Sequence, residues 1–167
     1  WVIDKSTALV PGGPVTFTEF PVHFDGSSGS PVIMQPCETF GNESTLYIID
    51  DPRLSFNGVR VLRLSRITGT GSSPSWSLAP GSTVQASSGL ISVGAANNFN
   101  FSQITAHQPG TTTRIQTQDS RIGSHAVFRN GRVWCSHSGG LPDSGTVDRT
   151  AVFWHELDPA GMSRVQG

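Results

Sequence analysis

The chain has 167 residues and a formal net charge of −1, and only 14% of its residues are charged, whereas 19 are glycine and 11 are proline. A nucleic-acid-binding module needs a basic face with net positive charge, so the composition excludes one. It also excludes a coiled coil, and no apolar run approaches the roughly 20 residues that cross a bilayer. We therefore predict one domain over residues 1–167, with no nucleic-acid partner and no membrane insertion.

Short β-favouring runs follow one another at steady spacing, separated by Gly, Pro, Asn, Asp or Ser. No window of a dozen residues has the i, i+3, i+4, i+7 apolar spacing of an amphipathic helix without a Gly or Pro in it. The chain is therefore predicted to be all-β. The predicted strands are Trp1–Asp4, Val15–Phe20, Pro31–Cys37, Thr45–Asp50, Val59–Ile67, Ser75–Leu78, Leu90–Val93, Arg114–Thr117, His125–Arg129, Arg132–His137, Thr150–Leu157 and Ser163–Gln166.

Two Asn-Gly pairs lie between runs of alternating apolar residues, at Asn130-Gly131 in VFRNGRVW and at Asn57-Gly58 in LSFNGVRV. A two-residue Asn-Gly loop accommodates the positive φ that a type I′ turn requires at both of its central positions. Each pair therefore predicts an antiparallel hairpin.

The predicted strand Thr150–Leu157 carries Phe153 and His155 on one face, with Val152 and Trp154 on the other. Large apolar side chains on both faces indicate a sheet that is covered on both sides, as in stacked propeller blades. At four strands per blade, the predicted strands make about three antiparallel blades of a β-propeller. A β-sandwich is the alternative.

The segments LYIID, LRLSRITGT, TTTRIQTQDSRIGSHAVFRNGRVWCSHSGG and RTAVFWHELD, together with the opening WVIDKSTALVPGG, are similar to a group of exported bacterial β-propeller-like repeat proteins. The resemblance covers most of the chain. It implies an extracellular or cell-surface location, with the periplasm as an alternative. Its motifs are structural, so it implies no catalytic residue.

The sequence GSSGSP at Gly26–Pro31 resembles the box around the nucleophile of chymotrypsin-like serine proteases, in which an upstream His and Asp activate the serine. Ser28 would be the nucleophile, with His23 as the one histidine before it. The two β-barrels of that fold cannot be built from the 27 residues that precede Ser28. We therefore interpret this segment as a loop.

Cys135 and His137 lie two positions apart on one predicted strand, and His155 lies on the next. Such a set could bind a metal ion if Asp119 or His125 completed the shell. Half-buried, hydrogen-bonded histidines are the interpretation we favour, so no metal is predicted. His137 and His155 are kept as candidate ligand-binding residues.

Two further candidates for ligand binding come from loops. Asp119 and Arg121 project together from an extended stretch, where they could hold a carboxylate or a sugar, although a turn with an inter-blade Arg contact is the favoured interpretation. Trp76 lies in a Ser/Pro-rich stretch, so we expect it to be the most exposed tryptophan. All four tryptophans could line a carbohydrate site, but Trp1, Trp134 and Trp154 lie in alternating strands, which favours packing in the core or between blades.

The two cysteines, Cys37 and Cys135, either form a disulfide across a sheet or remain buried thiols. The absence of a defined catalytic set favours a binding and assembly module without catalytic activity and without a cofactor. The alternatives are a carbohydrate-active enzyme on the same scaffold and a structural subunit of a surface layer or filament. We expect a protein or glycan partner, and flanking blades or further copies of the chain, since three blades cannot close a ring.

Overall fold

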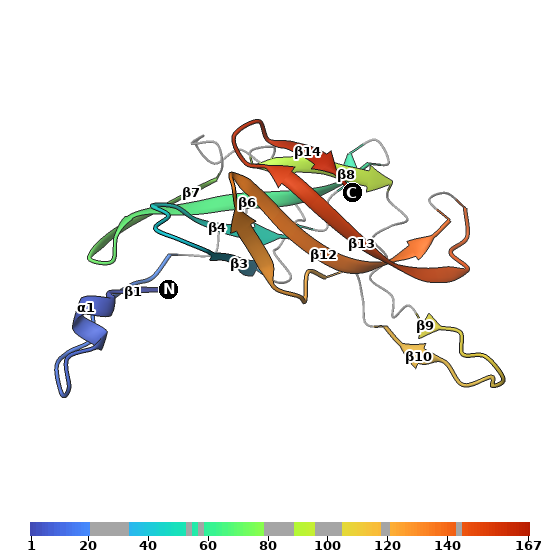
Figure 1. Cartoon of the computed structure of the whole chain (residues 1–167), viewed down its shortest axis with the longest axis horizontal. Coiled ribbons are helices and arrows are strands. Elements are labelled where there is room, and N and C mark those ends of the chain that lie inside the picture. Colours follow the sequence, from blue (N-terminus) through green and yellow to red (C-terminus); the bar gives the residue numbers. More distant parts are fainter. Residues whose placement is uncertain are drawn as a thin grey trace.

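The structure is a computed structural model that describes residues 1–20, 34–52, 55–56, 59–78, 89–95, 105–117, 121–142 and 145–167. Nearly all of its elements are strands, and its one helix is a single turn (Figure 1). The elements in chain order are β1 (Val2–Ile3), α1 (Lys5–Ala8), β2 (Phe17–Thr18), β3 (Met34–Thr39), β4 (Leu46–Asp50), β5 (Ser55–Phe56), β6 (Val59–Thr70), β7 (Ser73–Leu78), β8 (Leu90–Ala95), β9 (Thr105–Ala106), β10 (Ile115–Gln116), β11 (Ala126–Arg129), β12 (Arg132–Leu141), β13 (Arg149–Asp158) and β14 (Ser163–Gln166).

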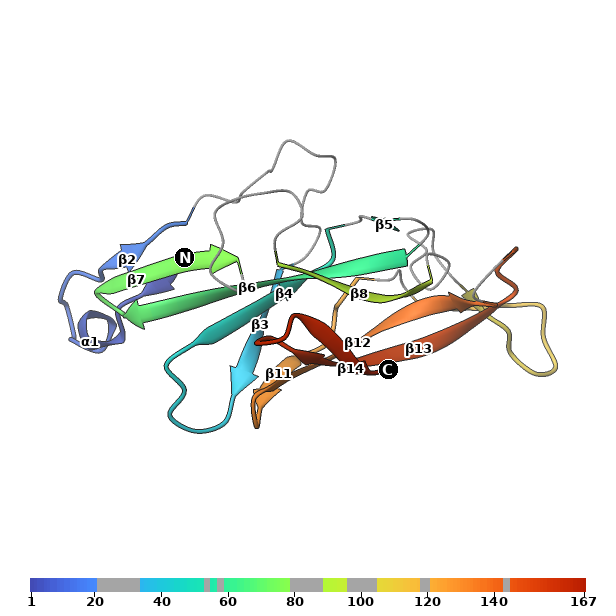
Figure 2. The same ribbon diagram turned by 90° about the horizontal axis from the view of Figure 1, so that it is seen from above.

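Ten strands form one curled sheet in the order β14-β13-β12-β11-β3-β4-β6-β5, and β7 and β8 also pair with β6. Strand β3 joins the two halves, because it is antiparallel to β4 and parallel to β11. Figure 2 shows the halves as two layers, with β4, β6 and β8 in one and β12, β13 and β14 in the other. The all-β prediction is confirmed. The predicted blades are not, because the β3–β11 pairing continues the sheet without a break and no blade count can be assigned to it.

The core fills the space between the two halves of the curled sheet. Leu62 and Leu64 of β6 and Val133 and Leu157 of the opposite half are completely buried. Burial of side chains of this size contributes about 1.5–3 kcal/mol each, so this one cluster holds the halves together. Its buried members are Cys37, Ile49, Leu62, Leu64, Ile91, Val93, Ile122, Ala126, Phe128, Val133, Cys135 and Leu157.

The prediction that both faces of the sheet are covered is correct for one strand and wrong for another. In β6, Leu62 is buried on one face and Val61 on the other. In β13, however, Val152 is 76% exposed and Trp154 is 46% exposed. The sheet curls away from these two side chains and toward the core on its opposite face, so the second apolar face of β13 meets solvent.

The hairpin predicted at Asn130-Gly131 is confirmed. Arg129 of β11 pairs with Arg132 of β12, which leaves two residues in the loop. Asn130 has φ 52° and Gly131 has φ 73°, as a type I′ turn requires. The second predicted turn, Asn57-Gly58, lies outside the described residues, although the strands on either side of it, β5 and β6, pair antiparallel.

The Gly131→Val substitution is expected to destabilise the fold by about 1–3 kcal/mol, because a β-branched residue is strained at positive φ. A Cβ at this position would meet no atom within 4 Å, so the cost is one of backbone conformation and not of a clash. Urea unfolding measures it, with Asn130→Gly as a control that tolerates positive φ. An unchanged midpoint for Gly131→Val would contradict the type I′ turn in solution.

Both cysteines are free and buried in the core cluster. Cys37 of β3 lies opposite Ala126 of β11, and the β11–β12 register brings Ala126 opposite Cys135. The two cysteines are therefore separated by a whole strand, or about 10 Å between Cα atoms, whereas a disulfide needs less than about 7 Å. Of the two alternatives left by the sequence, the structure shows buried thiols.

Burial raises the pKa of both thiols to about 12, so almost no thiolate forms at neutral pH. We expect a thiol reagent such as Ellman's reagent to leave the folded chain unmodified and to titrate both cysteines after unfolding. Air oxidation should not link them while the chain stays folded. Mass spectrometry showing the loss of two hydrogens from the native protein would contradict this register.

Residues 1–20 form an arm at one side of the sheet, made of the β1–β2 pair and α1 (Figure 1). The carboxylate of Asp4 caps α1 by accepting hydrogen bonds from the backbone N–H and the hydroxyl of Ser6, at 3.0 and 2.7 Å. Of the helices in the described ranges, none has the length and apolar character needed to cross a bilayer.

Candidate functional site

Strands β12 and β13 expose large apolar side chains on the face that points away from the core, and we call this face the outer face. It consists of alternate residues of both strands, namely Trp134, Ser136 and Ser138 of β12 with Val152 and Trp154 of β13. In the ladder, Ser136 pairs with Trp154 and Ser138 with Val152. Period-two alternation places their neighbours, including His137 and His155, on the buried side of the same strands.

Two tryptophans lie together at the centre of the outer face. Trp134 and Trp154 are diagonal neighbours across the ladder, and their rings are stacked with centroids 6.0 Å apart and planes 15° apart. They are 37% and 46% exposed, respectively. Two parallel indoles with exposed surface are a rigid apolar platform, since each ring restricts the other's rotamers.

Two hollows flank the tryptophans along β12. One, of about 390 Å³, is lined mainly by small polar groups, including Thr117, Ser124, Ser136 and Ser138, and also by Arg121, His137 and Val152. The other, of about 680 Å³, lies beside the β11–β12 turn and is lined by Val127, Arg129, Asn130, Arg132, Trp134 and Glu156.

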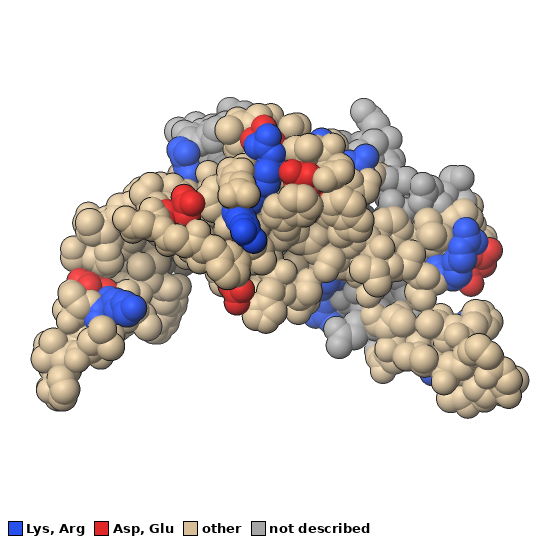
Figure 3. Space-filling model, viewed as in Figure 1, with Lys and Arg blue, Asp and Glu red and all other residues tan. Residues whose placement is uncertain are grey.

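Charged side chains gather at the two ends of the outer face and leave its centre neutral. At one end Arg132 lies 3.3 Å from a carboxylate oxygen of Asp158 and 3.8 Å from one of Glu156. At the other end Arg149 pairs with Asp148 at 2.9 Å. Figure 3 shows the resulting broad uncharged surface over β12 and β13.

A pair of buried histidines lies behind the outer face. His137 Nδ1 is 2.9 Å from the carbonyl oxygen of Ser138, which can only accept, so His137 carries its proton on Nδ1. His137 Nε2 therefore accepts, and His155 Nε2–H donates to it across 3.0 Å. Both ring nitrogens of His137 are thus engaged by the protein, and the tautomers of both rings are fixed.

The histidine pair is neutral at physiological pH. Burial lowers the pKa of His137, and nearby Arg60 lowers it further. For His155, burial, the His137 ring and Arg164 lower the pKa to about 3. Burial disfavours a charge on either ring, and a second positive charge 3.0 Å from the first would be more unfavourable still, so the pair stays uncharged.

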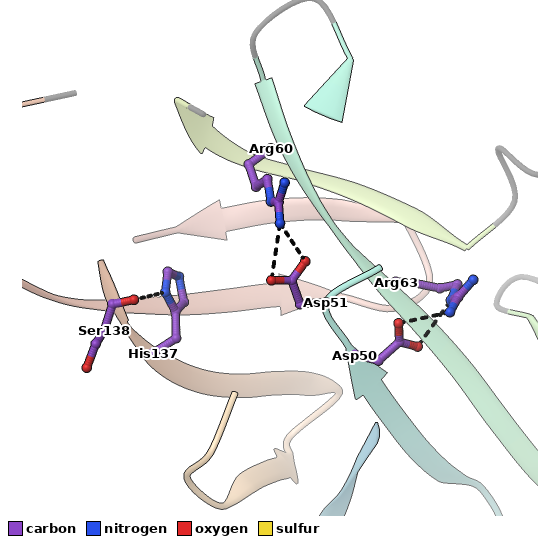
Figure 4. Close-up of polar contacts among 6 residues, drawn as sticks. All are labelled: Asp50, Asp51, Arg60, Arg63, His137 and Ser138. Carbon is purple, nitrogen blue, oxygen red and sulfur yellow. Dashed lines mark hydrogen bonds and ion pairs between the residues drawn. The ribbon is translucent and has the colours of Figure 1, made fainter. Parts of the chain in front are cut away.

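Two buried ion pairs, Arg63–Asp50 and Arg60–Asp51, are drawn together with His137 in Figure 4. Arg63 of β6 donates two hydrogen bonds to Asp50 of β4, at 3.0 and 3.1 Å, and these two residues face each other in the ladder. Arg60 donates to both carboxylate oxygens of Asp51 at 3.2 and 3.4 Å. All four side chains are buried, so charge is compensated inside the sheet and not at its surface.

The structure brings together some of the residues predicted from the sequence. Arg121 and His137 line the same hollow, and His155 lies directly behind it. Trp76 is half-buried in β7, where it pairs with Ile67, and it takes no part in this site. Asp119 lies outside the described residues, as does the segment around Ser28.

The predicted neighbours Cys135, His137 and His155 do share one face of adjacent strands. Cys135 is buried, and this burial raises the pKa of its thiol to about 12. His125, considered as a fourth ligand, is mostly exposed and lies 3.1 Å from Glu38. In the described ranges, no three His, Cys, Asp or Glu side chains gather in a way that would hold a metal ion.

The prediction that Trp134 and Trp154 pack in the core or between blades is wrong, because their side chains are exposed on the outer face. The signal was present: both occupy the same alternation positions as Ser136, Ser138 and Glu156, so each tryptophan shares a face with polar residues. Apolar residues on an otherwise polar face indicate exposure and a binding role more often than a second core.

Comparison with known proteins gives no match to a family model, to a curated protein or to a solved structure.

Proposed function

We propose that the chain is a binding module without catalytic activity, which works outside the cell or at its surface and binds its partner on the outer face. The observation that carries the proposal is the exposed, stacked pair of Trp134 and Trp154 on a sheet face. Tryptophan is among the residue types that contribute most to binding energy, and a rigid aromatic pair loses little entropy on binding.

The chemistry around the outer face supports binding without catalysis. A general base needs a nitrogen or oxygen that is available to the substrate, whereas both nitrogens of His137 are already hydrogen-bonded within the protein. Glu156 and Asp158 are the carboxylates nearest the tryptophans, and a glycosidase would need one of such a pair protonated. The N–H groups of Gly161 and Ala160, together with Arg132, lower the pKa of Asp158 and keep it ionised, so Asp158 does not serve as the general acid of such a pair.

Binding assays with outer-face variants test this function. The Trp134→Ser/Trp154→Ser double variant is compared with Phe40→Ser, a matched control because Phe40 is an exposed aromatic residue on the β3–β4 turn. Each protein is applied to an array of immobilised oligosaccharides and to an immobilised second copy of the chain. We expect the double variant to lose whatever binding the wild type and Phe40→Ser share. Oligosaccharide binding that survives in the double variant would show that the outer face is not the binding site.

A second candidate function, assembly with further copies of the chain, is supported by the arm of residues 1–20. Large apolar side chains cover this arm, and Trp1 and Phe17 stack on it with ring centroids 4.8 Å apart. An isolated two-stranded pair such as β1–β2 is marginally stable, so contact with a partner would stabilise it. The exposed apolar residues of the arm are Trp1, Ile3, Leu9, Val10, Val15 and Phe17.

Sedimentation velocity at tens of micromolar tests assembly. We expect the wild-type chain to self-associate and Phe17→Ser to shift the equilibrium toward monomer, because Phe17 is half exposed and stacked on Trp1. Phe40→Ser is again the control. A wild-type chain that is monomeric at this concentration would contradict self-assembly and leave the outer-face proposal unaffected.

A further inference from the structure

The two hollows and the tryptophan pair lie in one line on the outer face. The hollow beside the β11–β12 turn includes Arg132 and Trp134, and the hollow at the other end includes Ser136 and Ser138 of the same strand. At about 3.4 Å per residue, the stretch from Arg132 to Ser138 is about 20 Å long. A ligand that used the whole line would have to be extended.

The groups along this line match the chemistry of a sugar chain. A pyranose ring presents C–H groups on its faces, which pack on the electron-rich face of an indole, and hydroxyls around its edge. The indoles here lie at the centre, while hydroxyl and amide groups line both ends, among them Ser124, Ser138, Thr117 and Asn130.

The charge distribution favours a neutral ligand. Between its two ends, the outer face itself carries only Trp134, Ser136, Ser138, Val152 and Trp154. Arg121 lines the 390 Å³ hollow, but it is already engaged within the protein. In the hollow beside the turn, the two positive charges of Arg129 and Arg132 are balanced by the carboxylates of Glu156 and Asp158, both of which lie within 4 Å of Arg132. An anionic chain would gain little attraction from this surface.

A protein partner fits less well. The centre of a protein–protein interface is depleted in serine and enriched in large apolar residues. Here three serines, Ser124, Ser136 and Ser138, line the hollow next to the tryptophans, and Ser124 is hydrogen-bonded to Ser136. We propose that the partner is an extended, neutral oligosaccharide that lies along β12, stacks on Trp134 and Trp154 and fills both hollows. This inference rests on the proposed function, binding on the outer face.

Isothermal titration calorimetry with defined sugars tests this proposal. The probes are cellohexaose, maltohexaose and mannohexaose, each with its disaccharide, and hexagalacturonic acid as a charged hexasaccharide. We expect at least one neutral hexasaccharide to bind, more tightly than its own disaccharide and than hexagalacturonic acid. Raising the salt concentration should leave its affinity nearly unchanged. Binding of none of the three, or tighter binding of the acid, would overturn the proposal.

Variants locate the sugar. Trp154→Ala and Trp134→Ala should each weaken hexasaccharide binding by about tenfold or more, whereas Phe40→Ala should leave it unchanged. Ser138→Tyr, which fills the serine-lined hollow from an outward-facing position, should reduce the hexasaccharide's advantage over the disaccharide. Thermal unfolding checks that each variant is folded. Sugar binding that is insensitive to both tryptophans would overturn the proposed site.

The outcomes separate this inference from the function on which it rests. If no neutral sugar binds but Trp134→Ser/Trp154→Ser abolishes binding to a second copy, the outer face binds and the oligosaccharide proposal fails. If the double variant binds every probe as the wild type does, both the outer-face function and the oligosaccharide proposal fail. A steady release of reducing ends from the bound hexasaccharide would support the oligosaccharide as ligand. It would overturn the proposal that the chain has no catalytic activity.

Discussion

The chain is expected to lose stability steadily as the pH falls below about 6.5, because its two buried histidines resist protonation in the folded chain and take up protons when it unfolds. The unfolded chain binds a proton at each histidine near pH 6.5, whereas in the folded chain His155 resists protonation until about pH 3. A base with a lowered pKa in the folded state favours folding above 6.5, and that stability is lost as pH approaches the lower value. The loss is about 1.4 kcal/mol per pH unit for such a group.

Urea unfolding at intervals between pH 7.5 and pH 4 measures this slope. His155→Gln keeps an N–H that can donate to His137 but cannot titrate, so its stability should depend less steeply on pH. His125→Gln is the matched control, because it removes an exposed histidine and leaves the buried pair in place. Equal slopes in His155→Gln and the wild type would show that the histidine pair is not the source.

Local patterns in the sequence were sufficient to place most strands. Alternation within RVWCSH and AVFWHELD determines which residues of β12 and β13 share a face, and the observed burial follows that alternation. Asn130-Gly131 determines the turn by itself, because few residue pairs tolerate positive φ at both positions. These are short-range effects, and the sequence carries them within a few residues.

The joining of strands into one sheet could not be predicted in the same way. Strand β3 pairs with β11, about ninety residues away in the chain, through backbone groups that carry no sequence signature. The predicted blades depended on the opposite assumption, that neighbouring strands in sequence form separate sheets. The helix α1 was missed for another reason: a single turn capped by Asp4 is too short to show a helical period.

Only part of the candidate site could be predicted from the sequence, because some of its residues are placed by local strand positions and others by the packing of the whole sheet. His137 and His155 were recognised from their positions on adjacent strands, and Arg121 from its loop. The platform of Trp134 and Trp154 depends on which face of the sheet curls toward the core. Alternation shows which residues share a face, and the packing of the whole sheet decides which face is buried. The sequence signal for exposure was therefore limited to the polar residues that share a face with the tryptophans, Ser136, Ser138 and Glu156.

Removing the carboxylate of Asp50 is expected to cost about 3–5 kcal/mol of stability, the range for breaking one partner out of a buried ion pair. Asp50 and Arg63 face each other on β4 and β6, are both buried, and form two parallel hydrogen bonds of 3.0 and 3.1 Å. In Asp50→Ala the Arg63 guanidinium would remain in this low-dielectric site without that carboxylate. Equilibrium urea unfolding at pH 7 gives the loss.

Two further variants show how much of this loss comes from the unpaired buried charge. In Asp50→Leu/Arg63→Met both charges are replaced by apolar side chains, and stability should recover most of the loss, since desolvation of two ions offsets much of their attraction. Asp148→Ala breaks an equally short but exposed pair, with Arg149 at 2.9 Å, and should cost less than about 1 kcal/mol. If Asp50→Ala were as mild as Asp148→Ala, water would have to reach Arg63 in solution, and the two halves of the sheet would be less tightly closed than their burial indicates.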